Sequence, residues 1–101
     1  MKVARLELSG EKGVRPVRQN DAVICDSVCV GWVLSSATAG SRQIAIVYMD
    51  KDKATEGSSV DVYYLARSES QVSKGRKQAV KYGEKINGDI AAKVVSRFEK
   101  F

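Results

Sequence analysis

The sequence contains no histidine and only two cysteines, and these shortages exclude several kinds of chemistry. Histidine is the commonest general base in enzymes and the usual partner of a serine or cysteine nucleophile. A structural zinc site takes four ligands, which two thiols cannot supply. The sequence also has no glycine-rich phosphate-binding motif. We therefore predict no metal site and no catalytic residue, and we expect the isolated chain to be inactive as an enzyme.

The two cysteines, Cys25 and Cys29, are too far apart in sequence for a redox Cys-x-x-Cys motif. We expect them to be small apolar strand residues that face each other near a turn. A disulfide across that turn is the alternative.

Long apolar runs are also missing from the sequence. None approaches the roughly 20 residues that a membrane-spanning helix needs, and the residues after Met1 lack the apolar core of a signal peptide. The length of 101 residues, with 44% hydrophobic and 29% charged residues, is ordinary for one soluble globular domain. We expect a single domain over residues 1–101, in the cytoplasm and without a membrane partner.

Alternation of apolar with other residues dominates the rest of the chain and predicts β-strands. We expect strands near residues 4–8, 21–25, 28–34, 44–49, 60–64 and 89–98, with a polar loop over 35–41. Turn residues recur at short intervals between these segments. The sequence therefore predicts an all-β fold, a small antiparallel β-barrel of about six or seven strands.

One basic segment, residues 68–85, departs from this pattern. It holds five basic residues against two acidic ones, so it contributes +3 to the net charge of +5 of the chain. Gly75 and Gly83 would interrupt any helix here. We predict an excursion at the tip of a hairpin that joins two long strands. Its candidate basic patch consists of Lys74, Arg76, Lys77 and Lys81; a solvated surface loop is the alternative.

Two strands are apolar on both faces, which a barrel open to water on its outside does not require. In the segment 28–34 the face with Val28, Val30, Trp32 and Leu34 stands opposite one that carries Val33. In the segment 44–49 the two faces carry Ile44, Ile46 and Tyr48, and Ala45, Val47 and Met49. Something must cover the outer face: a partner, or the chain's own ends or excursion. The candidate partner-surface residues are Val33, Ala45 and Val47, although a slip of one residue exchanges the two faces.

Several short motifs along these strands form a recognisable series. They are Gly31-Trp32-Val33-Leu34-Ser35, then Ile44-Ala45, then Gly57, and finally Ala92-Lys93-Val94-Val95. The series resembles the C-terminal barrel of the glycine-cleavage T-protein (aminomethyltransferase) superfamily. In that family a Gly-x-Val-Thr-Ser strand, an Ile-Ala strand, a strand begun by glycine and an Ala-x-Val-Val strand follow in this order. The resemblance covers about residues 4–98, with Leu34 in place of the usual threonine.

This resemblance implies an accessory role. In such enzymes the C-terminal barrel buttresses the folate cleft, whereas the cleft and the principal catalytic acid belong to other domains. The complete protein would move a one-carbon unit to or from tetrahydrofolate, its implied cofactor, and this chain would bind no cofactor alone. No catalytic or cofactor-binding residue carries over. The implied partner is a catalytic folate-binding domain or subunit, with self-association as the alternative.

Two other functions remain open from the residues themselves. A sequence pI near 9.4 and the basic segment are compatible with a nucleic-acid-binding barrel. Tyr82, however, is the only aromatic residue between positions 65 and 97, whereas proteins that bind single strands present several stacking platforms. We therefore expect only weak, non-specific nucleic-acid binding. A non-catalytic assembly module is the other alternative.

Overall fold

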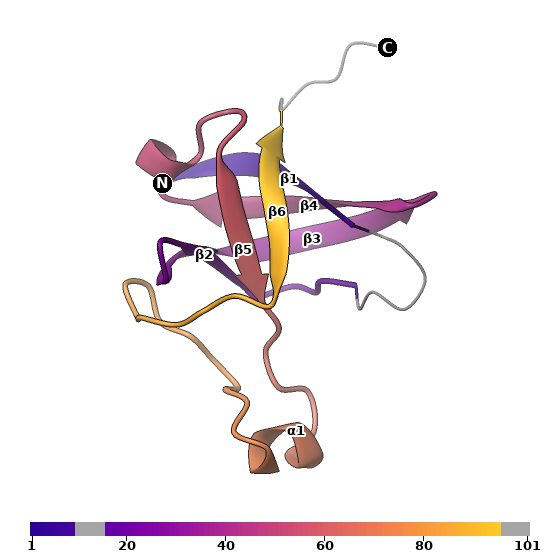
Figure 1. The fold of residues 1–101 in the computed structure, drawn as a ribbon, viewed down its shortest axis with the longest axis vertical. Helices are drawn as coiled ribbons and strands as arrows, with labels where there is room; N and C mark the ends of the chain where they lie inside the picture. Colours follow the sequence, from indigo (N-terminus) through magenta and orange to yellow (C-terminus); the bar gives the residue numbers. More distant parts are fainter. Residues whose placement is uncertain (10–15, 96–101) are drawn as a thin grey trace.

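The computed structural model describes residues 1–9 and 16–95, which form an antiparallel β-barrel with one long connection hanging from it (Figure 1). The strands are β1 (Lys2–Ser9), β2 (Ala22–Cys25), β3 (Val28–Ala39), β4 (Arg42–Met49), β5 (Ser59–Tyr63) and β6 (Ile90–Val95). A 3-10 turn, η1 (Lys51–Lys53), follows β4, and a short helix, α1 (Glu69–Ser73), lies in the connection. The strands close in the order β1-β4-β3-β2-β5-β6. The predicted all-β antiparallel barrel is confirmed.

The barrel interior is filled by the inward residues of all six strands. Ala4, Leu6 and Leu8 point inward from β1, as their alternation predicts. Val60 and Val62 do so from β5. The other core members, from the remaining strands and two connections, are Val17, Val23, Val30, Val33, Ala45, Val47, Met49, Ala54, Ala92 and Val94. Burial of this apolar surface is the main force that holds the barrel together. Among the described residues, no helix is long and apolar enough to cross a membrane.

The third strand differs from its expected phase because it contains two bulges. The first leaves Val30 as an extra residue opposite β2, since Val23 pairs with Gly31 and Ile24 with Cys29. Val30 therefore lies in the core, whereas Trp32 is 36% exposed, although both were expected on one face. A bulge inserts one unpaired residue and so reverses the alternation of faces beyond it.

The second bulge accompanies a hairpin that is longer than expected. β3 pairs with β4 up to Ala39 opposite Arg42, so most of the predicted polar loop at 35–41 is strand. The connection is reduced to Gly40 and Ser41, with Gly40 at a φ of 64°. A glycine adopts this conformation without the steric cost of a side chain. The expectation failed because serine, threonine and alanine lack the apolar alternation that marks a strand.

Gly31 lies where the neighbouring strand β4 approaches the backbone of β3 closely. A Cβ atom at this position would lie 2.2 Å from the Tyr48 carbonyl oxygen and 2.6 Å from the Met49 Cα. Any larger residue would therefore force β3 and β4 apart.

The excursion is the connection from Tyr64 to Asp89, between the paired strands β5 and β6, as the predicted hairpin requires. It covers one outer face of the barrel. A second apolar cluster consists of Ala22, Ile24, Cys29, Tyr63 and Leu65, with Val80 and Ile86 packed against it. One face of β2 packs in the barrel core and the other packs in this cluster. This packing explains why β2 has apolar residues on both faces.

The two cysteines lie on opposite faces of the β2–β3 hairpin. Cys25 packs against the barrel core, whereas Cys29 belongs to the cluster under the excursion. Both thiols are free. The expectation that they face each other is wrong because Cys25 pairs with Val28 and Cys29 pairs with Ile24, so their side chains alternate rather than align.

Candidate functional site

The residues chosen from the sequence as a partner surface lie inside the barrel. Val33, Ala45 and Val47 are all 0% exposed and belong to the core. A surface made by these three residues is therefore ruled out in this fold, and the assignment is corrected to the opposite face of the same strands. The sequence could not decide between the two faces, because both are apolar.

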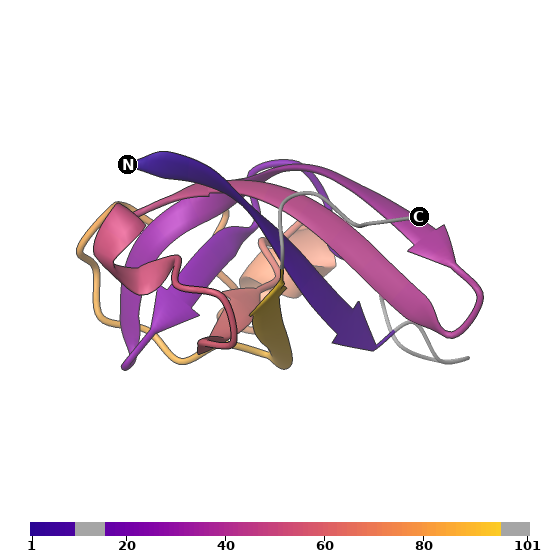
Figure 2. The ribbon, with the colours of Figure 1, turned by 90° about the horizontal axis from the view of Figure 1, so that it is seen from above.

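The apolar outer face lies on β1, β4 and β3, which run side by side along one side of the barrel (Figure 2). Tyr48 in β4 is central, since it pairs with Val3 on one side and Trp32 on the other. The Trp32 and Tyr48 rings make an edge-on contact with their centroids 5.6 Å apart. Leu34, at the second bulge, is 38% exposed. The apolar outer face comprises Val3, Trp32, Leu34, Ile44, Ile46 and Tyr48.

A pocket of about 360 Å³ opens at the edge of this face, beside Trp32. Its other lining residues come from the loop before β2 and from the excursion: Asn20, Leu65, Arg67, Gln78, Ala79 and Val80. Trp32 therefore belongs to both the apolar outer face and the pocket, which we call the Trp32 pocket. Nothing in the sequence indicated the pocket, because its walls are far apart along the chain.

The candidate basic patch is only partly a free cationic surface. The Arg76 guanidinium makes two bonds to the Asp89 carboxylate, of 3.0 and 2.5 Å, and donates to the Tyr64 carbonyl oxygen at 2.6 Å. It also lies over the Tyr63 ring, 4.2 Å from the centroid. Its bond to Asp89 raises the Arg76 pKa above its usual value. Arg76 is thus a clasp that fastens the excursion to the end of β5.

Lys77 and the two remaining patch residues have different environments. The Lys77 ammonium lies 2.7 Å from a Glu84 carboxylate oxygen. This bond raises the Lys77 pKa and lowers the Glu84 pKa. Lys74 and Lys81 are exposed. The structure therefore gives Arg76 and Lys77 structural contacts and leaves Lys74 and Lys81 facing solvent.

Two further contacts tie the excursion to the barrel. Buried Asp21 accepts hydrogen bonds from the Leu65 amide at 3.1 Å and the Arg67 guanidinium at 2.9 Å. At the other end, the Tyr82 hydroxyl donates to the Asp50 carboxylate at 2.8 Å. Asp21 is 1% exposed, and a buried carboxylate held by hydrogen bonds in this way fixes the segments that carry its partners.

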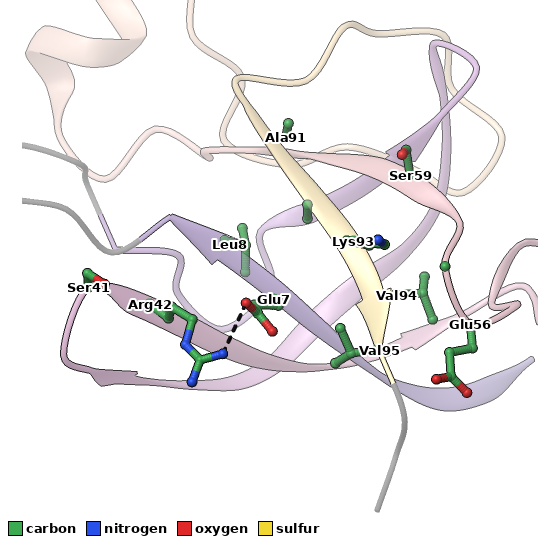
Figure 3. Close-up of a pocket in the computed structure, with 12 residues that line it drawn as sticks. Glu7, Leu8, Ser41, Arg42, Glu56, Ser59, Ala91, Lys93, Val94 and Val95 are labelled. Atoms are coloured by element: carbon green, nitrogen blue, oxygen red, sulfur yellow. Dashed lines mark hydrogen bonds and ion pairs between the residues drawn. The ribbon is translucent and has the colours of Figure 1, made fainter. Parts of the chain in front are cut away.

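A larger groove than the Trp32 pocket lies across the barrel from β3, where β1 meets β6 (Figure 3). Its volume is about 1090 Å³. Glu7 pairs with Lys93 across the strands and makes a 3.4 Å ion pair with Arg42, while Glu56 lies at the rim. Charges of both signs alternate along this groove. It offers polar contacts to a ligand.

The chemistry available to the described residues is limited. In the part of the chain that the structure covers, no group of three or more histidine, cysteine, aspartate or glutamate side chains could hold a metal ion. Burial raises the pKa of both thiols, Cys25 and Cys29. A raised pKa lowers the fraction of reactive thiolate at neutral pH. The features that stand out are therefore surfaces for binding.

Comparison of the sequence with models of known protein families and with curated proteins finds no match.

Proposed function

We propose that this chain is an accessory C-terminal barrel of a tetrahydrofolate-dependent aminomethyltransferase-like protein. In this role it buttresses the folate cleft of a catalytic domain and performs no turnover alone. The proposal rests on the motif series from Gly31 to Val95 and on one observation in the structure. That observation is the apolar outer face, on which Trp32 and Leu34 are 36% and 38% exposed.

An exposed group of large apolar side chains in the middle of a sheet favours burial against another surface. Tryptophan and tyrosine are enriched at the centres of protein interfaces. The excursion covers the outer face at β2 and at Tyr63 of β5, and the equivalent cover over β3 and β4 would come from the catalytic domain. Tetrahydrofolate would then bind to that domain.

The test is to produce the chain together with the folate-binding domain encoded in the same gene or operon. We expect a stable one-to-one complex by light scattering and folate-dependent one-carbon transfer only in that complex. Leu34→Asp should abolish the complex and leave the fold intact, because Leu34 is exposed. Ser59→Asp, an exposed site on β5, is the matched control and should have no effect. The absence of any folate-binding domain from the gene and operon would overturn the proposal.

A further inference from the structure

The excursion does more than cover β2, since it also builds one wall of the Trp32 pocket. The Ala66 amide donates to the Lys77 carbonyl oxygen at 2.8 Å, and the Lys77 amide donates to the Tyr63 hydroxyl at 3.0 Å. These bonds hold the following residues, Gln78 to Val80, next to Leu65. The wall is therefore fixed before any ligand arrives, which lowers the entropy lost on binding.

Apolar and polar groups line the pocket in similar measure. Leu65, Ala79 and Val80 provide aliphatic surface, and the exposed Trp32 ring provides an aromatic wall. Asn20, Arg67 and Gln78 add amide and guanidinium groups to the lining. Its volume of about 360 Å³ lies at the small end of the range of about 300–1,000 Å³ for ligand pockets. It suits one large apolar side chain.

The excursion that builds this wall carries a positive charge. Between Tyr64 and Asp89 there are six basic residues and three acidic ones, a net charge of +3. Three of the basic residues, Arg67, Arg76 and Lys77, have carboxylate partners. The other three are the exposed Lys74, Lys81 and Lys85. Arg67 lines the pocket itself, and Lys81 directly follows the pocket residue Val80.

We propose that the Trp32 pocket binds an acidic protein segment that inserts one large apolar side chain. The inference goes beyond the proposed function and does not depend on a folate-binding partner. The Trp32 ring and the aliphatic side chains of the pocket would hold the anchoring side chain, and the cations of the excursion would attract carboxylates on either side of it. A protein segment is favoured over a nucleic acid because Trp32 is the only ring that lines the pocket. Single-strand binding normally uses several rings in succession.

The test uses a natural reporter, since Trp32 is the only tryptophan in the chain. The probe is a synthetic peptide with one phenylalanine flanked on both sides by glutamates. Its comparison peptide has serine in place of the phenylalanine. We expect the first peptide to change the Trp32 emission in a saturable way and to bind about tenfold more tightly than the second.

Three substitutions separate the pocket from general electrostatics. Ala79→Leu fills the pocket from an exposed position and should weaken binding about tenfold. Lys81→Glu should weaken binding and reduce its salt dependence. Lys93→Glu makes the same change of charge in the groove on the far side and should leave binding unchanged. Circular dichroism of each variant would verify the fold.

Other results would overturn the proposal. Equal binding of the two peptides would show that only charge is recognised. Tighter binding of oligothymidylate than of the phenylalanine peptide would assign the site to single-stranded nucleic acid. Unchanged affinity in Ala79→Leu would place any binding outside the pocket. None of these results bears on whether a folate-binding domain docks on the apolar outer face.

Discussion

On β2, and at Tyr63 at the end of β5, the side chains that point away from the barrel lie under the excursion. On the outer side of β3 Trp32 and Leu34 are exposed, and the outward side chains of β4 are half-buried. Ile24 is 1% exposed and Tyr63 is 6% exposed, while Trp32 and Leu34 are each more than a third exposed. Both regions have apolar residues on both faces of their strands. The same sequence pattern thus occurs in two structural settings. In one the outer apolar face is covered by the excursion, and in the other no part of the described chain covers it.

The difference shows that apolar residues on both faces of a strand predict a cover without identifying it. For β2 the cover is the excursion, clasped by Arg76 and held by Asp21. The apolar outer face lies on the other side of Trp32 from that cover, and we assign it to a partner. Substitutions matched between the two regions can test this distinction.

The largest expected effect comes from placing a charge inside the barrel. Val47→Asp would bury a carboxylate among apolar side chains, which costs several kcal/mol. This is comparable with the whole stability of a small domain, about 5–15 kcal/mol. We expect the variant to lose the β-sheet signal in circular dichroism. Ile46→Asp, on the outer face of the same strand, is the control and should still melt cooperatively; a cooperative melt of Val47→Asp would contradict the assignment of faces.

A smaller effect should separate the covered region from the open one. Ile24→Ala leaves a cavity under the excursion and should lower the free energy of unfolding by about 3 kcal/mol. Leu34→Ala removes an exposed side chain and should change it by no more than about 0.5 kcal/mol. Urea denaturation monitored by circular dichroism measures both. Equal losses in the two variants would mean that the excursion does not protect β2.

The fold could be predicted from the sequence wherever apolar and polar residues alternate regularly along a strand. Ala4, Leu6 and Leu8, and likewise Val60 and Val62, point inward as expected. The alternation failed at the bulges of β3, because one extra residue reverses the faces. It also missed the end of β3, where small polar residues such as Ser35 pair with β4 without apolar alternation.

The candidate site was less predictable for a different reason. The Trp32 pocket joins residues from the loop before β2, from β3 and from the excursion, and no local pattern records such a meeting. The basic patch could be predicted from the high content of lysine and arginine in this segment. Amino-acid composition, however, does not reveal which of these residues form ion pairs. Arg76 and Lys77 find their carboxylate partners, Asp89 and Glu84, only in the folded chain.

A more local effect is expected from loosening the cover. Arg76→Ala removes the charge-assisted bonds to Asp89 and the bond to the Tyr64 carbonyl, a loss of about 1–3 kcal/mol. We expect faster hydrogen exchange at the Ala66 amide, which bonds to the Lys77 carbonyl, and faster proteolysis within residues 68–85. Arg76→Lys keeps the charge without the forked geometry and should be intermediate. Lys74→Ala, at an exposed position, is the control; identical proteolysis of all the variants would show that Arg76 is no clasp.

The smallest effect concerns the far end of the cover, where Tyr82 meets Asp50. The hydrogen bond from the Tyr82 hydroxyl lowers the Asp50 pKa and raises the Tyr82 pKa. The contribution of Asp50 is therefore complete above its unfolded pKa and is lost as the pH falls through its folded pKa. The contribution of Tyr82 is complete below its unfolded pKa and is lost as the pH rises through its folded pKa. The contact should persist across the neutral range between these limits.

Carboxyl carbon shifts measured by nuclear magnetic resonance can follow this contact directly. In Tyr82→Phe the Asp50 pKa should rise towards its ordinary value, because the donor hydroxyl is gone. The Glu84 pKa should stay low in the same variant, since the Lys77 ammonium still bonds to it. Because both Tyr82 and the Asp50–Tyr82 bond are exposed, overall stability should change little. If Asp50 titrated identically in both proteins, the Tyr82 hydroxyl would not bond to it in solution, and this end of the excursion would be held by its backbone bonds to Ser27 and Cys29.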